Sequence, residues 1–150
     1  MSIILVYFAN YKQLSYKKKL RKLISIFYNF HISVPVRLGG NGSSLTEGFV
    51  EALNTTTGRW GGVCHNSFDV IDAHVVCRMM GFTTAIVALA NGAADDLYGT
   101  LPSNSSFVLD NLACSGLETS IFDCRQTGEL SEICDVSQIA GVKCATSKLL

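Results

Sequence analysis

The first 40 residues of this chain contain no acidic side chain, and the first carboxylate is that of Glu47. Seven cations lie in this acid-free stretch, whereas the rest of the 150 residues carries five cations and all twelve acids, a formal charge of −7. A charge step of this kind usually separates a targeting segment or a tail from a folded domain. Because 150 residues suit one compact unit, the sequence predicts an N-terminal segment, residues 1–35, ahead of a single acidic domain.

The chain also lacks a long apolar run. The stretch 1–9 is short, and the stretch 23–36 is interrupted by Asn29, His31 and Pro35, whereas a membrane-spanning helix needs about 20 apolar residues. The order of a basic run and a short apolar run resembles a degraded signal peptide, or a gene start upstream of the true one. The alternative is a disordered basic tail that touches anionic lipid or nucleic acid only weakly.

Motifs of catalysis are missing as well. The sequence contains no G-x-S-x-G or H-E-x-x-H motif, and no glycine-rich phosphate loop precedes a helix. The three histidines, His31, His65 and His74, are scattered over the tail, a strand end and a helix. We expect His74 to be a half-exposed helix residue without a catalytic partner. The sequence therefore predicts a protein that is not an enzyme.

The six cysteines are even in number, and none precedes Cys64. None of their spacings is C-x-x-C, the spacing that is usual in structural zinc sites, so the sequence does not favour zinc binding. Buried free thiols, natural in the cytosol, and disulfides, natural outside the cell, are the remaining alternatives. Glycosylation sequons at Asn41, Asn54 and Asn104 lie in polar, turn-like sequence. Together with the even cysteine count they favour disulfides and an extracellular glycoprotein.

The pattern of apolar residues predicts several strands and one main helix, which is an α+β domain. The helix is expected over residues 69–80, with Asp69 as N-cap, Cys77 facing the core and Gly81 at its end. A hairpin is expected where Asn54–Gly58 joins two strands. The remaining expectations are strands at 49–53, 59–64, 107–109 and 139–143, a short helix or turn at 117–123, and a long loop at 83–106 that holds one strand or short helix at 84–89.

Six blocks of sequence follow one another in a fixed order. They are Val36–Gly40 (VRLGG), Glu47–Glu51 (EGFVE), Arg59–Cys64 (RWGGVC), Asp72–Arg78 (DAHVVCR), Leu109–Gly116 (LDNLACSG) and Ala140–Cys144 (AGVKC). In this order they resemble a scavenger receptor cysteine-rich (SRCR) domain over residues 36–145, which leaves 146–150 as a C-terminal tail. The resemblance implies an α+β fold in which a curved antiparallel sheet cradles the helix at 69–80.

The resemblance also implies a disulfide pattern. Phe82 stands where the eight-cysteine type carries its helix-exit cysteine, so the chain is similar to the six-cysteine group A type. The family pairing, carried onto this sequence, joins Cys64 to Cys134, Cys77 to Cys144, and Cys114 to Cys124. Six cysteines permit 15 pairings, and the sequence by itself chooses none of them.

The function that the resemblance implies is non-catalytic ligand recognition outside the cell, in a secreted protein or the ectodomain of a membrane receptor. One expectation is a scavenger-type module of innate immunity that binds patterns, proteins or polyanions. The alternative is a structural, disulfide-stabilised module that binds a protein without calcium or polyanion. We expect an extracellular protein or polyanionic partner, no nucleic acid, and membrane attachment only through a further segment of a larger receptor.

Many members of the family hold Ca²⁺ through acids at two places, and this chain departs from that pattern. His65 and Asn66 replace the acidic pair after the first matched cysteine, and Gln138 with Ile139 replaces the acidic block before the last. Calcium prefers several oxygen ligands, carboxylates above all. The usual site is therefore expected to be lost or weak.

A second acidic cluster, Asp95, Asp96 and Asp110, is the remaining calcium candidate. A domain near −7 repels anionic ligands unless a local cationic patch or a bound cation reverses the field. The candidate cations are Arg37, Arg59, Arg78 and Arg125. Arg59 and Arg78 have an alternative role, which is to pair with acids. Trp60 is predicted to lie in the core because it is embedded in a matched strand.

Overall fold

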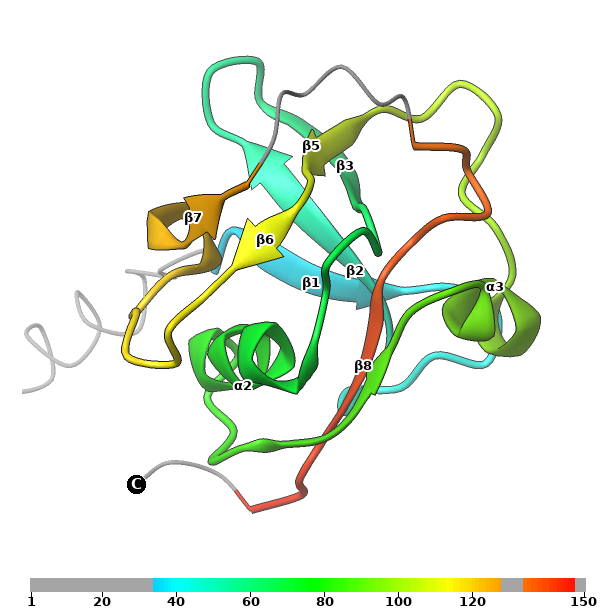
Figure 1. Ribbon diagram of the computed structural model, residues 1–150. Helices are drawn as coiled ribbons and strands as arrows, with labels where there is room; N and C mark the ends of the chain where they lie inside the picture. The colour runs from blue at the N-terminus through cyan, green and yellow to red at the C-terminus, as the bar shows by residue number, and fades with distance from the viewer. Residues whose placement is uncertain (1–33, 128–133, 148–150) are drawn as a thin grey trace, which may run out of the picture. The chain divides into compact units, whose positions relative to one another are not determined.

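The computed structural model describes residues 34–127 and 134–147. The elements in chain order, drawn in Figure 1, are β1 (Val36–Gly39), β2 (Glu47–Asn54), β3 (Arg59–Val63), α2 (Val70–Met79), β4 (Ala85–Leu89), α3 (Ala93–Tyr98), β5 (Phe107–Leu109), β6 (Leu112–Ala113), the 3-10 helix η1 (Ile121–Asp123), β7 (Arg125–Gln126) and β8 (Gly141–Cys144). The predicted signal-like segment or tail lies outside the described residues except for Val34 and Pro35. Val34 packs against the core, and the Pro35 carbonyl accepts the Leu53 N–H at 2.9 Å.

Six strands form one curved sheet in the order β4-β8-β2-β3-β5, and β1 pairs with the other edge of β2. The pairs are antiparallel except for β3 with β5, which run parallel. The expected hairpin is confirmed: β2 and β3 pair directly, and Asn54 Oδ1 accepts the N–H groups of Thr56 and Thr57, each at 3.0 Å. A side chain that bonds its own turn in this way stabilises the loop that it begins. β6 and β7 form a separate small sheet.

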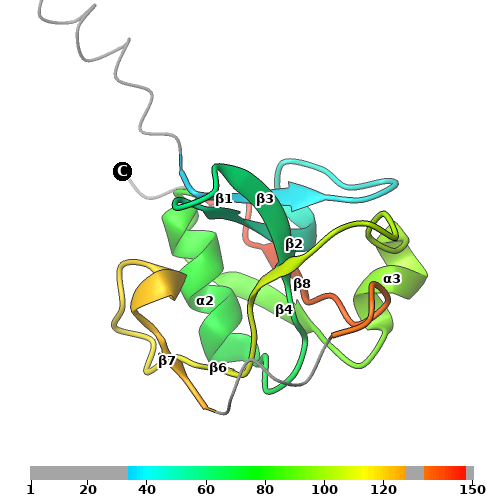
Figure 2. The same cartoon turned by 90° about the horizontal axis from the view of Figure 1, so that it is seen from above.

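α2 and α3 cover opposite faces of the sheet, as Figure 2 shows from above. Alternation along β2 explains this arrangement, because successive side chains of a strand point to opposite faces. Val50 and Ala52 belong to the main core together with residues of α2, whereas Phe49 belongs to a smaller core with Ala94 and Tyr98 of α3. The face that carries α2 therefore holds most of the buried apolar residues.

The main helix begins and ends close to where its sequence predicts. Asp69 is the N-cap, and its carboxylate accepts the N–H groups of Ile71 and Asp72. Asp72 completes a capping box, because its Oδ2 accepts the Asp69 N–H at 2.8 Å. Cys77 is fully buried, as expected, and Gly81 takes a left-handed conformation (φ 85°) beyond the C-cap.

Three disulfides tie the outer segments to this framework, in the same pairs that the family resemblance implies. Cys77–Cys144 joins α2 to β8, Cys64–Cys134 joins the end of β3 to the segment before β8, and Cys114–Cys124 closes the loop before β7. The first two span 67 and 70 residues, and the third spans 10. In the chain-entropy model the long bridges contribute about 4 kcal/mol each and the short one about 3 kcal/mol.

The segment 83–106 is more ordered than its composition predicts. The strand or short helix expected at 84–89 is a strand, β4, but α3 at Ala93–Tyr98 was not expected at all. Gly92 and Gly99, both with positive φ, bound this short helix, which has no side-chain cap. Ser147 pairs with Thr83 through a backbone bond at 3.1 Å, so the chain beyond β8 packs back onto the segment before β4.

Candidate ligand-recognition surface

The face of the sheet opposite α2 carries an arginine stacked on a tryptophan. Arg37 lies opposite Glu51 in the register of β1 and β2. Its Nε donates to Glu51 Oε2 at 2.8 Å and its Nη2 donates to Oε1 at 3.1 Å, while its guanidinium carbon lies 4.4 Å from the Trp60 ring centroid. The bidentate pair fixes the guanidinium plane, and the indole face attracts the cation. The Arg37 side chain is 50% exposed, but Glu51 compensates its charge.

The prediction that Trp60 lies in the core was wrong. Trp60 is only partly buried, because it pairs with Leu53 on the same face as Glu51 and Arg37. Val63, three residues further along β3, belongs to the main core and is fully buried. The matched block is therefore part of the surface as well as of the sheet.

A second ion pair lies on the same face, at the end of the sheet that α3 covers. Glu47 and Lys143 are opposite each other on β2 and β8, and Lys143 Nζ lies 2.7 Å from Glu47 Oε2. The hydrogen bond to Glu47 raises the pKa of Lys143, and burial raises the pKa of the Tyr98 hydroxyl. This pair lines a pocket of about 270 Å³ with four further residues: Val87, Leu89, Leu97 and Tyr98.

The chemistry of this pocket suits an apolar group beside a polar edge. Its volume lies at the lower limit of pockets that enclose small molecules, which hold roughly 300 Å³ or more. The walls are aliphatic or aromatic except for the ion pair, and the raised pKa of Lys143 keeps its amine protonated and not nucleophilic. The pocket therefore offers apolar walls with one charged edge.

The other candidate arginines lie in different surroundings. Arg78, in the last turn of α2, donates from Nη2 to the backbone carbonyls of Gly116 at 2.7 Å and Glu118 at 3.0 Å. It therefore bonds to backbone carbonyls and not to acids. The side chains of Arg59 and Arg125 are exposed and make no hydrogen bond or ion pair among the described residues.

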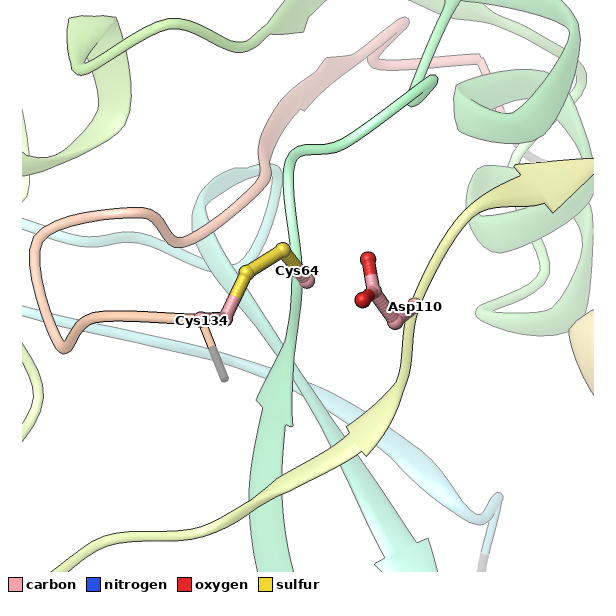
Figure 3. A group of neighbouring side chains, drawn as sticks. All are labelled: Cys64, Asp110 and Cys134. Atoms are coloured by element: carbon pink, nitrogen blue, oxygen red, sulfur yellow. A yellow bond between two sulfur atoms is a disulfide. The ribbon is translucent and has the colours of Figure 1, made fainter. Parts of the chain in front are cut away.

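The acidic candidates do not form one group. Asp95 and Asp96 lie in the first turn of α3, whereas Asp110 is buried after β5 beside the Cys64–Cys134 disulfide (Figure 3). Among the described residues, the groups of three side chains with potential ligand atoms within 4.8 Å are Asp110 with Cys64 and Cys134, and Glu118 with Cys114 and Cys124. Since each of these cysteines is in a disulfide, neither group offers a thiolate to a metal.

The residues at the positions that hold calcium in many family members make hydrogen bonds within the domain here. The His65 N–H donates to the Gln138 carbonyl at 2.9 Å, and Gln138 Oε1 accepts the Asp135 N–H at 2.7 Å. Asn66 Nδ2 points to Cys134 Sγ at 3.8 Å. His65, Asn66 and Gln138 supply no carboxylate, so this donor set does not fit calcium.

The three sequons lie at the surface in different ways. Asn41 and Asn104 are exposed, whereas Asn54 is partly buried because its side-chain oxygen holds the β2–β3 turn. His74 is half-buried as expected, and its Nδ1 lies 2.9 Å from Thr84 Oγ1. Glycosylation at the three positions stays a prediction.

Several residues of this surface were not predicted from the sequence. The pocket depends on Tyr98 and Leu97 of α3, which was expected to be loop, although Gly92 and Gly99 on either side of the helix were a usable signal. The two ion pairs join residues far apart in sequence, Arg37 with Glu51 and Lys143 with Glu47. Strand register sets these pairs, and a single sequence does not reveal register. No helix within the described ranges is both long and apolar enough to cross a bilayer.

The comparisons with known proteins all point to the same family. The model of the scavenger receptor cysteine-rich domain matches residues 40–145. Galectin-3-binding protein from Mus musculus is 40% identical over 105 residues, which are 70% of this chain and 17% of that protein. Lysyl oxidase homolog 2 from Homo sapiens is 38% identical over 111 residues, which are 74% of this chain and 13% of that protein.

Solved structures agree with the sequence matches. The third SRCR domain of murine neurotrypsin superposes with a TM-score of 0.61 and 29% identity, covering 73% of this chain and 94% of that one. The dimeric form of the SRCR domain of mouse MARCO gives a TM-score of 0.54 and 30% identity, covering 66% and 86%.

The matched domain accounts for most of this chain but only a small share of its curated relatives, 17% of galectin-3-binding protein and 13% of lysyl oxidase homolog 2. The relatives and the family support an extracellular, non-catalytic protein-interaction module as the class of this domain. By sequence, by fold and by its three disulfides, this chain belongs to the scavenger receptor cysteine-rich family.

Proposed function

We propose that this domain recognises a protein partner outside the cell, without calcium and without a polyanion. The observation that carries the proposal is the way its cations are used. Arg37 and Lys143 pair with carboxylates of their own sheet, and Arg78 bonds to two backbone carbonyls. Three of the five cations among the described residues are thus engaged within the domain, which leaves little to attract an anionic polymer.

The overall charge supports the same choice. The described residues contain five cations and ten carboxylates, a formal charge of −5. The mouse relative is, by its name, a galectin-3-binding protein. That name supports a protein partner of some kind for this chain, and it does not identify the partner.

Capture of polyanions is the second candidate function. Arg59 and Arg125 favour it, because both side chains are exposed and neither has a partner among the described residues. Two uncompensated arginines on a negative domain predict weak, salt-sensitive binding at most. Scavenger-type pattern recognition in innate immunity would require more than this pair.

The test uses the full chain secreted from mammalian cells with its disulfides mapped by mass spectrometry. Binding is measured to heparin and to a panel of purified extracellular proteins, each with calcium and with EDTA. We expect at least one discrete protein partner whose affinity is unchanged by EDTA, and no retention on heparin at about 0.15 M salt. Retention at that salt, abolished by Arg59→Ala with Arg125→Ala, would instead establish polyanion capture.

Secretion is tested by the same sample. An extracellular protein leaves the cell with all six cysteines oxidised and with glycans on the sequons. A chain that stays inside the cell with free thiols would contradict the extracellular setting and, with it, the proposed function.

A further inference from the structure

The loop between Cys114 and Cys124 contacts the first turn of α2, and both segments carry exposed apolar side chains. Leu117 in this loop is 88% exposed, and Val70 and Ile71 at the start of α2 are 47% and 39% exposed. A Cβ atom added to Gly116 would lie 3.2 Å from Ile71 Cγ2, so the loop and the helix are in contact here. We name Val70, Ile71 and Leu117 the helix–loop patch.

The loop that carries Leu117 is held by its own residues. The Glu118 carboxylate accepts the Ser115 N–H at 2.8 Å and the Gly116 N–H at 2.9 Å. These bonds stabilise the ionised form and lower the pKa of Glu118 to about 2. The Cys114–Cys124 disulfide closes the same loop. The backbone on both sides of Leu117 is therefore fixed before any partner binds.

Two side chains of α2 fasten this loop to the helix. Arg78 donates to the carbonyls of Gly116 and Glu118, which flank Leu117. At the other end of the helix, Asp72 Oδ1 accepts the Cys114 N–H at 2.9 Å. The two segments of the helix–loop patch thus form one rigid unit.

A single exposed leucine is ordinary on a protein surface. A leucine whose loop is already ordered differs, because binding then costs little conformational entropy. An exposed apolar side chain on a backbone that is held in this way is suited to fill an apolar pocket of a partner. The ordered backbone of the patch therefore favours a role in partner binding over the interpretation that Leu117 is an ordinary exposed residue.

Charge around the patch indicates the chemistry of the partner. Asp69 precedes Val70 and Glu118 follows Leu117, so a carboxylate borders the patch on each of its two segments. The nearby cation, Arg78, is only partly exposed and bonds to the two loop carbonyls, and the two carboxylates outnumber it. An apolar centre with an acidic border is complementary to an apolar side chain with a basic border.

We propose that the helix–loop patch is the docking surface for a partner protein that presents an apolar side chain between lysine or arginine side chains. This inference rests on the proposed protein-binding function and names the surface that performs it. It is separate from the arginine–tryptophan stack and from the pocket beside α3, which lie on the opposite face of the sheet.

The test begins with a random peptide library displayed on phage and selected on the immobilised, oxidised full chain. We expect the enriched peptides to share a large apolar residue flanked by lysine or arginine. The tightest peptide is then synthesised, and its Kd is measured by fluorescence anisotropy. Leu117→Ser is expected to raise this Kd about tenfold or more.

Two further variants distinguish a loss of binding at the patch from a general effect on the fold or the surface. Asp69→Asn removes one border charge but keeps a residue that caps a helix, so Kd should rise about threefold. Leu45→Ser is the matched control, because Leu45 is 86% exposed and lies outside the patch, and its Kd should be unchanged. Each variant is first shown to retain three disulfides and an unaltered melting temperature.

The outcomes that overturn the proposal differ from those that overturn protein binding itself. Peptides that bind Leu117→Ser as tightly as the parent chain, or that share no basic residue, would refute this docking surface. The extracellular protein panel would still report a partner in that case, so the proposed function would stand. A selection that enriches no peptide would also refute the docking surface.

Discussion

The two faces of the sheet are stabilised in different ways. The face under α2 has 18 buried residues in one core, a helix with a full capping box, and the disulfide that joins this helix to β8. The face under α3 has a core of five buried residues and a six-residue helix without a side-chain cap. Among the described side chains, the one buried polar atom without a hydrogen-bond partner, Asp95 Oδ1, also belongs to α3.

The α2 face and the α3 face are therefore expected to respond differently to substitution. The α2 face combines burial, capping and a covalent bond, so changes there are expected to affect the whole domain. The α3 face contributes the pocket and tolerates an imperfectly bonded helix, so changes there are expected to remain local. Of four measurements, two compare the faces directly and two concern the α2 side alone.

The largest effect is expected from removal of the disulfide on the α2 face. Cys77→Ala together with Cys144→Ala opens a bridge that spans 67 residues, which should lower the free energy of unfolding by about 4 kcal/mol in urea titrations. The matched control is Cys114→Ala with Cys124→Ala, whose bridge spans 10 residues and should cost about 3 kcal/mol. A smaller loss from the long bridge than from the short one would contradict this order.

The two cores offer a matched pair of buried isoleucines. Ile121 belongs to the larger core and Ile139 to the smaller one, and both are fully buried. Ile121→Ala should cost about 4 kcal/mol and Ile139→Ala about 2 kcal/mol, because a small core beside an uncapped helix relaxes more readily around a cavity. Urea unfolding measures both values. Equal costs would show that the α3 face is as tightly packed as the α2 face.

The two helices carry an aspartate at the same position, the third residue after the N-cap. Asp72 accepts the N–H groups of Asp69 and Cys114, whereas Asp95 Oδ1 has no partner. Asp72→Ala leaves buried donors unpaired and should cost about 2 kcal/mol. Asp95→Ala should change the free energy of unfolding by less than about 0.5 kcal/mol, since only a helix-dipole interaction is lost. Thermal unfolding of both variants tests the contrast, and a similar loss for both would break it.

The smallest effect concerns Glu118, on the α2 side, as a function of pH. Its pKa is about 2 in the folded chain and 4.5 ordinarily, so the stability that it contributes is fully present above about pH 4.5 and is lost as the pH falls to about 2. The difference in unfolding midpoint between the parent chain and Glu118→Gln should therefore shrink over this interval. A difference that stays constant down to pH 2 would mean that the carboxylate does not hold the loop.

The elements that the sequence predicted well are those with local signals. The helix α2 has its N-cap, its apolar spacing and its terminal glycine within a dozen or so residues. The cap and the glycine act as predicted, and Cys77 is buried, whereas Val70, at the same helical spacing, is exposed. The hairpin after Asn54 has the same local character. The disulfide pairs, by contrast, follow from the family resemblance, because loop closure alone does not distinguish one pairing from another.

The parts that the sequence did not reveal depend on register and on neighbours. Trp60 looked like a core residue because its strand is apolar, and only pairing with Leu53 places it on the outer face beside Arg37. α3 was missed because an Ala- and Asp-rich segment has no strong periodicity. The exposure of Leu117 follows from contacts of Arg78 and Glu118, which no spacing predicts.

The place of β8 in the sheet governs when the domain can assemble during its synthesis. β8 lies between β4 and β2, although both neighbours precede it in the chain by more than 50 residues. A nascent chain that has emerged only as far as η1 therefore displays two strand edges with no partner between them. These edges are covered only after Gly141–Cys144 has emerged from the ribosome. Cys77 likewise has no native disulfide partner until Cys144 has emerged. Completion of this sheet and closure of this disulfide thus both depend on the synthesis of β8.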